Sequence, residues 1–206
     1  MALRLNYNPV AKRTQEQKAA LPDDVQQRLK SWEDAGQKRS CLKRLKKNES
    51  SVKVGDIFLV GLREHPNVLF YGRVLHIISA PQKLDWLNGE CIAFIFKCHT
   101  KTKTLDNLII DYDNVICGPE ILSTVFWEKG NLETIGNIHL TKEEKQLDMG
   151  FWNNDIIGKG GQFVDKHLKP MNHFPKYFQW RALCTYDGIT YHLKKAIIID
   201  PSLAEE

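Results

Sequence analysis

Two short runs of apolar residues constrain the fold of this chain more than any other part of its sequence. The first run is Val-Gly-Asp-Ile-Phe-Leu-Val at residues 54–60, and the second is Phe-Tyr-Gly-Arg-Val-Leu at residues 70–75. β-Branched and aromatic residues are typical of strands, and each run carries a glycine where a backbone must bend or approach another closely. The two runs therefore predict a pair of neighbouring strands.

The pattern after residue 54 is mainly that of strands separated by turn residues. It predicts strands at residues 56–62, 68–78, 91–98, 105–111 and 121–127. Near the C-terminus, residues 180–186 and 189–193 flank Asp187-Gly188, a dipeptide that suits a type I′ turn, so they predict a β-hairpin. Thr141 and Glu144 match a capping box and predict a short helix within residues 141–148.

The first fifty residues have a helical pattern instead. Pro22, Asp23 and Asp24 are typical of a helix start, and Gly36 is a suitable end. Between them lie Val25, Leu29 and Trp32 on one apolar stripe, which we expect to pack on another element. A second helix is predicted over residues 38–47. The sequence thus predicts an α+β fold, with a curved, barrel-like and mainly antiparallel sheet in residues 51–206 and a basic helical extension, residues 1–50, packed on it.

Charge is distributed unevenly along the chain. The formal net charge is +4, but residues 1–50 carry 12 Lys and Arg against 6 Asp and Glu, whereas residues 51–206 carry 17 against 19. Six basic residues fall within positions 38–47. Such a run most often forms a solvated face, but it could also attract phosphates or an acidic protein.

Length and cysteine content point to an ordinary soluble domain of a reducing compartment. A chain of 206 residues can bury a core without a disulfide or a structural metal. It has no apolar run of the length that crosses a bilayer and no signal-peptide pattern at its N-terminus, so we expect a cytoplasmic protein. The five cysteines are odd in number, which fits reduced thiols.

Recognisable catalytic and cofactor motifs are missing from the sequence. It has no nucleophile elbow, Walker loop or dinucleotide fingerprint, and its seven histidines and five cysteines lack the spacing of common metal sites. The prediction is therefore a protein without catalytic residues, cofactor or metal. An endoribonuclease built from dispersed His, Lys and Tyr residues, or a Cys–His pair assembled by the fold, stays open.

A glycine-rich segment supports a second functional hypothesis. Gly158-Lys159-Gly160-Gly161 is similar to the Gly-x-x-Gly loop of KH domains, where a tight turn between two helices lets RNA phosphates approach. With the basic helix at 38–47 and the aromatic residues around 174–180, it could bind single-stranded RNA. The simpler interpretation is a flexible turn without a ligand.

Three short motifs carry a resemblance to a known family. They are the Gly-Asp-Ile-Phe opening at 55–58, the Tyr-Gly-Arg-Val strand at 71–74 and the Ile-Gly step at 135–136. Together they resemble the Immunity protein 26 family, whose members are inferred to protect bacteria from secreted polymorphic toxins. The resemblance implies binding and occlusion of a cognate toxin domain without catalysis. We expect the motif residues to frame the sheet: Gly55, Asp56, Phe58, Tyr71, Gly72, Arg73, Ile135 and Gly136.

A toxin-binding surface would carry charge complementary to its partner, because complementary charge accelerates association. Nuclease toxins are usually basic, so either the slightly acidic body of the chain binds the toxin or the toxin is of another kind. The candidate contact residues are the charged ones of the two densest groups and of the glycine-rich loop: Lys43, Arg44, Lys46, Lys47, Asp106, Asp111, Asp113 and Lys159.

Overall fold

The computed structural model describes residues 2–36, 41–48, 51–79, 86–154 and 160–205. Within these ranges the chain forms five α-helices, a short 3-10 helix at Pro201–Ala204 and ten strands. The helices are α1 (Pro9–Ala19), α2 (Asp23–Asp34), α3 (Val125–Glu128), α4 (Lys142–Lys145) and α5 (Tyr186–Ile199). The strands are β1 (Arg4–Leu5), β2 (Asp56–Gly61), β3 (Leu69–Ile77), β4 (Cys91–Thr100), β5 (Val115–Leu122), β6 (Glu133–Asn137), β7 (Met149–Asn154), β8 (Gly161–Val164), β9 (Tyr177–Trp180) and β10 (Leu183–Cys184).

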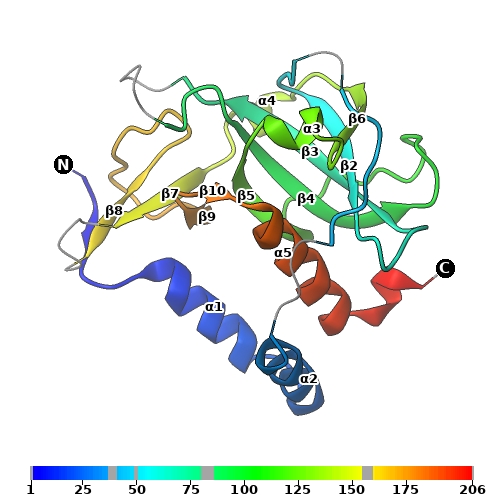
Figure 1. Ribbon diagram of the computed structural model, residues 1–206. Helices are drawn as coiled ribbons and strands as arrows, with labels where there is room; N and C mark the ends of the chain where they lie inside the picture. Colours follow the sequence, from blue (N-terminus) through cyan, green and yellow to red (C-terminus); the bar gives the residue numbers. More distant parts are fainter. Residues whose placement is uncertain (1, 37–40, 49–50, 80–85, 155–159, 206) are drawn as a thin grey trace.

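The larger sheet has six strands in the order β10-β5-β4-β3-β2-β6. All its neighbours are antiparallel except β10 and β5, which run parallel. Its strands are curved (Figure 1), but the order ends at β10 and β6, so the described strands form an open sheet and not a closed barrel. The α+β class and the mainly antiparallel sheet predicted from the sequence are confirmed.

A second sheet of four strands lies beside the first, in the order β1-β8-β7-β9. Strand β1 brings the N-terminus to β8, where Arg4 pairs with Gln162. Behind this sheet a small core forms from Val10 of α1 together with Trp152, Phe163 and Phe178. The N-terminal residues are therefore integral to the second sheet.

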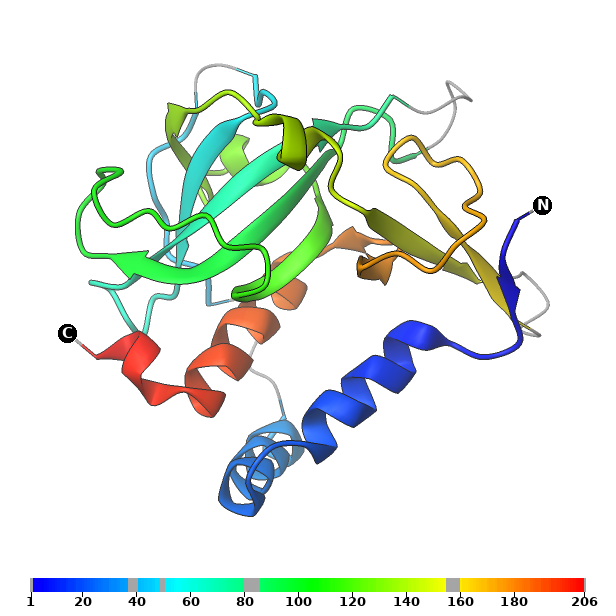
Figure 2. The same ribbon diagram turned by 180° about the vertical axis from the view of Figure 1, so that it is seen from behind.

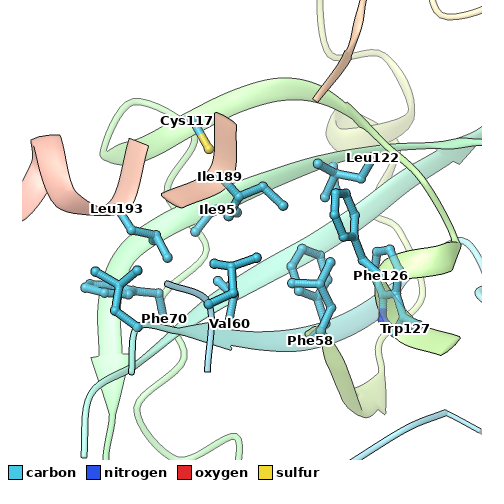
Figure 3. Packing of buried hydrophobic residues seen from close by; sticks show 14 of the residues in the cluster. Phe58, Val60, Phe70, Ile95, Cys117, Leu122, Phe126, Trp127, Ile189 and Leu193 are labelled. Atoms are coloured by element: carbon cyan, nitrogen blue, oxygen red, sulfur yellow. The ribbon is translucent and has the colours of Figure 1, made fainter. Parts of the chain in front are cut away.

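Strand β2 is buried along its whole length because the larger sheet is covered on both faces. On one face Phe58 and Val60 pack in the cluster that includes Ile189 and Leu193 of α5 (Figure 3). On the other face Ile57 and Leu59 lie in a cluster with residues of β7 and β8. A strand buried on both faces needs a continuous apolar run, which is the pattern seen at residues 57–60.

The predicted helix from Asp23 is confirmed as α2, and its apolar stripe packs as expected. Val25 and Leu29 are buried, and the ring of Trp32 stacks on Tyr191 of α5 at 5.4 Å between centroids. Helix α1 was not predicted from the sequence. It begins after Asn8, whose side-chain oxygen accepts hydrogen bonds from the backbone N–H groups of Val10 and Ala11, both at 3.1 Å.

The predicted basic helix over 38–47 is wrong. Residues 37–40 lie outside the described part of the chain, and residues 41–48 run without helical structure. Leu42 forms a β-bridge with Leu62, and the backbone N–H groups of Lys43 and Leu45 donate to the carbonyls of Gly61 and Gly130. These bonds to the sheet satisfy the backbone of the segment and override its helix propensity.

The predicted C-terminal hairpin is also wrong, since Asp187-Gly188 lies in the first turn of α5. The Thr185 hydroxyl accepts a hydrogen bond from Gly188 N–H at 3.1 Å and caps the helix. Ile189 and Leu193, four residues apart, are then both fully buried against the sheet. The cap and this burial outweigh the turn preference of the dipeptide.

Two predicted strands have different boundaries or structure. Residues 105–111 form a bend, a short turn and an irregular stretch with no ladder partner, and the next strand is β5. The strand predicted at 121–127 ends at Leu122. The Glu90 carboxylate accepts hydrogen bonds from the Ser123 hydroxyl and the Thr124 backbone N–H, and these bonds help to start α3. The capping box between Thr141 and Glu144 is confirmed, with both reciprocal bonds present.

None of the helices in the described residues combines the length and apolar character needed to cross a lipid bilayer.

His76 at the end of β3 is a partly buried histidine whose ring packs edge-on against His167, 4.8 Å away between centroids. Burial, helped by the nearby His167 and Lys166, lowers the pKa of His76 to about 4, while Asp165 acts in the opposite direction. The unfolded chain would take up a proton near pH 6.5, where the folded protein does not. Folding stability contributed by this site is therefore lost as the pH falls from about 6.5 towards about 4.

We expect His76→Leu to reduce the fall in thermal unfolding midpoint between pH 7 and pH 5. Unfolding followed by circular dichroism at pH 7, 6 and 5 measures this. The matched control is His139→Leu at an exposed position, which should keep the wild-type pH profile. Equal profiles for the wild type and His76→Leu would contradict the assignment.

Candidate functional site

Two of the motif glycines, Gly55 and Gly136, lie where β2 pairs with β6. Gly55 has φ +89°, and a Cβ atom there would lie 2.5 Å from the carbonyl oxygen of Ile138. The neighbouring Asp56 carboxylate accepts hydrogen bonds from the Asn137 side chain at 2.7 Å and from Lys53 N–H at 2.9 Å. Ile135 and Gly136 lie in β6 itself, and Gly136 faces Leu105. These residues fasten one edge of the larger sheet.

The Tyr-Gly-Arg step in β3 is packed as tightly. A Cβ atom at Gly72 would lie 2.2 Å from the ring of Phe58, so only glycine leaves room for that ring beside β3. The Tyr71 hydroxyl donates to the carbonyl of Thr104 at 2.8 Å and anchors the long connection between β4 and β5.

Arg73 has no exposed surface and forms a buried ion pair with Glu144 of α4. Its Nε lies 2.7 Å from Glu144 Oε1, and its Nη2 donates to Oε2 at 2.9 Å. Burial acts to raise the pKa of Glu144, but hydrogen bonds from Tyr112, Arg73 and the Thr141 backbone lower it below its usual value. The Tyr112 hydroxyl donates to the same carboxylate at 2.6 Å. The motif arginine thus joins the larger sheet to the capping box.

A cleft of about 900 Å³ lies on another part of the molecule. Its walls come from α1, β5, β9 and α5, with contributions from Asp113 before β5 and from β10. Figure 2 shows α1 (blue) and α5 (orange to red) on the same side of the molecule, below the two sheets. None of the eight motif residues lines this cleft.

Glu120 of β5 is the central charged group of the cleft and is only 5% exposed. Its Oε1 accepts a hydrogen bond from the Gln179 side chain at 2.9 Å and lies 3.3 Å from His192 Nε2 of α5. Glu120, Gln179 and His192 come from three different elements. The sheets and the helix therefore meet at this carboxylate.

Two thiols lie close to Glu120. The ligand atoms of Cys117, Glu120 and His192 all lie within 4.8 Å of one another. Burial raises the pKa of Cys117 well above its ordinary value, and Glu120 adds to the shift. Burial and Glu120 also raise the pKa of Cys184 on β10. Both sulfurs are therefore protonated at neutral pH, so neither resembles the activated thiolate of a cysteine enzyme.

Basic side chains surround the cleft. Arg13 of α1 stacks on the ring of Phe178, 4.1 Å from its centroid, and burial lowers its pKa although Glu120 raises it. Burial likewise lowers the pKa of Lys195 on α5. Lys18 forms an ion pair with Glu33 at 2.6 Å. The cleft therefore combines one buried carboxylate with a cationic wall.

The basic candidate contact residues do not line the cleft. Arg44, Lys46 and Lys47 are exposed along the extended segment, while the Lys43 ammonium donates to the carbonyl of Pro66. The backbone N–H of Lys46 donates to Glu133 on β6 at 3.1 Å. The backbone of this segment thus runs from the end of β2 at Gly61 to Glu133 of β6.

The acidic candidates are exposed in the connection between β4 and β5. Asp113 lines the cleft, where it pairs with Lys176 at 2.9 Å and accepts a hydrogen bond from the Tyr177 hydroxyl. Asp106 and Asp111 do not line it. The structure thus brings one candidate, Asp113, to the cleft and leaves the other two on the connection.

A KH-like loop would need a helix on either side of the glycine-rich segment, and the described residues on both sides of it form none. Lys159 lies outside the described residues, and the elements on either side are strands β7 and β8. A Cβ atom at Gly160 would lie 2.3 Å from the carbonyl of Leu5, and one at Gly161 would lie 2.4 Å from that of Asn153. These glycines permit close packing of β1, β7 and β8, which explains their presence without RNA.

Comparison with family models identifies the family to which the larger sheet belongs. The model described as Immunity protein 26 matches residues 53–160, just over half of the chain. The chain belongs to the Immunity protein 26 family. Searches of curated proteins and of solved structures returned no match.

The Immunity protein 26 match covers only part of the cleft. It includes β2 to β7 and hence the motif residues, Cys117 and Glu120. Helices α1, α2 and α5 and strands β9 and β10 lie outside it, with Arg13, Gln179 and His192. Cys117 and Glu120 thus belong to the part matched by the family, whereas most of the residues that line the cleft do not.

The Glu120 cluster of this Immunity protein 26 member has no local spacing pattern in the sequence. Cys117 and Glu120 are three residues apart, but Gln179 and His192 are distant in sequence and carry no local spacing signal. One signal was available, because Glu120 is the single charged residue in the apolar strand Val115–Leu122. A lone carboxylate in such a strand indicates a buried polar partner.

Proposed function

We propose that this protein is an immunity protein of the bacterial cytoplasm that binds a cognate toxin domain and occludes its active or target-binding surface without catalysing a reaction. The observation that carries the proposal is membership of the Immunity protein 26 family. Its motif residues serve the sheet and its buried ion pair, which leaves the surface loops to contact a partner.

The connection between β4 and β5 is our candidate for the toxin-contacting surface. Ile109 is 65% exposed and Ile110 is 37% exposed, although both are large apolar residues. Asp106 and Asp111 lie close to them in sequence and are also exposed. An apolar centre with an acidic surround suits a partner with a basic face, because the apolar part excludes water and the charges steer association. The Tyr71 hydroxyl holds the start of this connection in place.

Co-expression tests both the function and the surface. The probe is whichever toxin domain the neighbouring gene encodes, and we expect the wild-type protein to restore growth when that domain is induced; a neighbourhood without a toxin gene would count against the function. The double variant Ile109→Asp, Asp111→Lys should weaken binding of the purified toxin domain at least about tenfold and reduce survival, because it removes apolar contact and reverses a steering charge.

The matched control carries the same kinds of change on α3, where Val125 and Glu128 are exposed. Val125→Asp, Glu128→Lys should keep wild-type binding and survival. Loss of protection only in the α3 variant would place the contact elsewhere. An adjacent toxin that is bound by neither the wild type nor the variants would contradict the proposed function.

A further inference from the structure

The floor of the cleft holds three side chains whose donor atoms suit a metal ion. A thiol from Cys117, a carboxylate oxygen from Glu120 and an imidazole nitrogen from His192 all lie within 4.8 Å of one another. Two tetrahedral ligands of one Zn²⁺ ion, each about 2.0–2.3 Å from the metal, are separated by roughly 3.3–3.8 Å. Small side-chain rotations therefore suffice to bring the three atoms onto one ion.

The type of donor narrows the choice of ion. Sulfur, imidazole nitrogen and carboxylate oxygen together match the ligand set of Zn²⁺, whereas Mg²⁺ and Ca²⁺ prefer oxygen ligands alone. Cys117 and Glu120 are each 5% exposed, and the His192 side chain is 26% exposed to the cleft. An ion can therefore enter through the cleft, and a water molecule or the nearby Cys184 thiol can complete its coordination.

The three candidate ligands are held by a hydrogen bond and by regular elements, as ligands of metal sites in proteins usually are. Gln179 donates a hydrogen bond to the Glu120 carboxylate at 2.9 Å and so fixes its orientation from outside the cluster. Cys117 and Glu120 are on the rigid strand β5, and His192 is on the well-packed helix α5 between the buried residues Ile189 and Leu193. Ligands on such elements are held in place before the ion arrives.

We propose that Cys117, Glu120 and His192 bind one Zn²⁺ ion at the floor of the cleft. The ion joins β5, which belongs to the part matched by the family, to α5, which does not. It displaces the thiol proton of Cys117 on binding and replaces the direct contact between Glu120 and His192. Zn²⁺ binding at this site does not require a toxin.

The test uses the full-length protein after removal of metals by a chelator. Titration calorimetry with Zn²⁺ should show one ion bound per chain, and titration with Co²⁺ should give a sulfur-to-metal charge-transfer band in the near ultraviolet. Zn²⁺ should also raise the thermal unfolding midpoint, because it binds the folded state. Cys117→Ser should abolish the Co²⁺ band.

His192→Ala and Glu120→Gln should each weaken Zn²⁺ binding at least about 100-fold, since even the loss of a supporting group often costs 10–100-fold. Glu120→Gln keeps the volume of the side chain, so it tests Zn²⁺ binding even if Cys117→Ser does not fold. The matched control Cys98→Ser, outside the cleft, should retain both binding and the band. Absence of one-to-one Zn²⁺ binding by the wild type, or binding unchanged by His192→Ala and Glu120→Gln, would overturn the proposal.

Discussion

Arg73→Ala is expected to lower the free energy of unfolding by about 3–5 kcal/mol, which is a large part of the stability of an ordinary domain. The guanidinium has no exposed surface, and its removal leaves the Glu144 carboxylate buried without its main partner. The hydroxyl of Tyr112 and the backbone of Thr141 still donate to Glu144, but they bring no positive charge. Urea denaturation followed by circular dichroism measures the loss.

A second variant separates the loss of charge pairing from the loss of packing. Arg73→Met keeps most of the apolar volume, and adding Glu144→Gln removes the unpaired charge while keeping oxygen for the capping bonds. The double variant should be more stable than Arg73→Met alone. The control is Arg28→Ala, which breaks an exposed pair with Asp24 and should cost at most about 0.5 kcal/mol. An equally small loss for Arg73→Ala would contradict the role of the buried pair.

Trp127→Ala is expected to cost about 3–5 kcal/mol as well, because it leaves a large cavity in the main core. Trp127 is 1% exposed, and its ring meets that of Phe58 edge-on at 5.0 Å between centroids (Figure 3). Phe58 in turn lies over Gly72, so the loss reaches the centre of the sheet. The measurement is again the free energy of unfolding in urea.

Trp86→Ala provides the matched control, since Trp86 is 58% exposed. We expect its effect to stay within about 0.5 kcal/mol, as is usual for surface substitutions. Similar losses for the two tryptophan variants would mean that Trp127 does not anchor the core.

The pair β2 and β3 could be predicted from the sequence because its signal is local. A continuous apolar run with a glycine opposite Phe58 has few alternatives to a strand buried on both faces. The capping box at Thr141 was equally local, since both reciprocal bonds lie within four residues. The residues that define these elements are close together in the sequence, so the elements can be predicted from it.

The errors arose where tertiary contacts compete with local preference. Asp187-Gly188 favours a hairpin turn in isolation, but the Thr185 cap and the burial of Ile189 on the sheet favour a helix. The segment from residue 41 has helix-forming residues, but Leu42 pairs with Leu62 instead. The cleft was beyond prediction for the same reason, because the partners of Glu120 reach it from β9 and α5.

The pairing of β1 with β8 has a practical consequence for laboratory work on this protein. The family match ends at residue 160, one residue before β8 begins, and starts well after β1. A fragment cut to the matched range would lack β1, β8, β9 and the helix that covers Phe58 and Val60. It would expose adhesive apolar surface and invite precipitation. Shortened versions for crystallisation or interaction screening should therefore keep both ends of the chain, and a bulky affinity tag is better separated from Arg4 by a spacer.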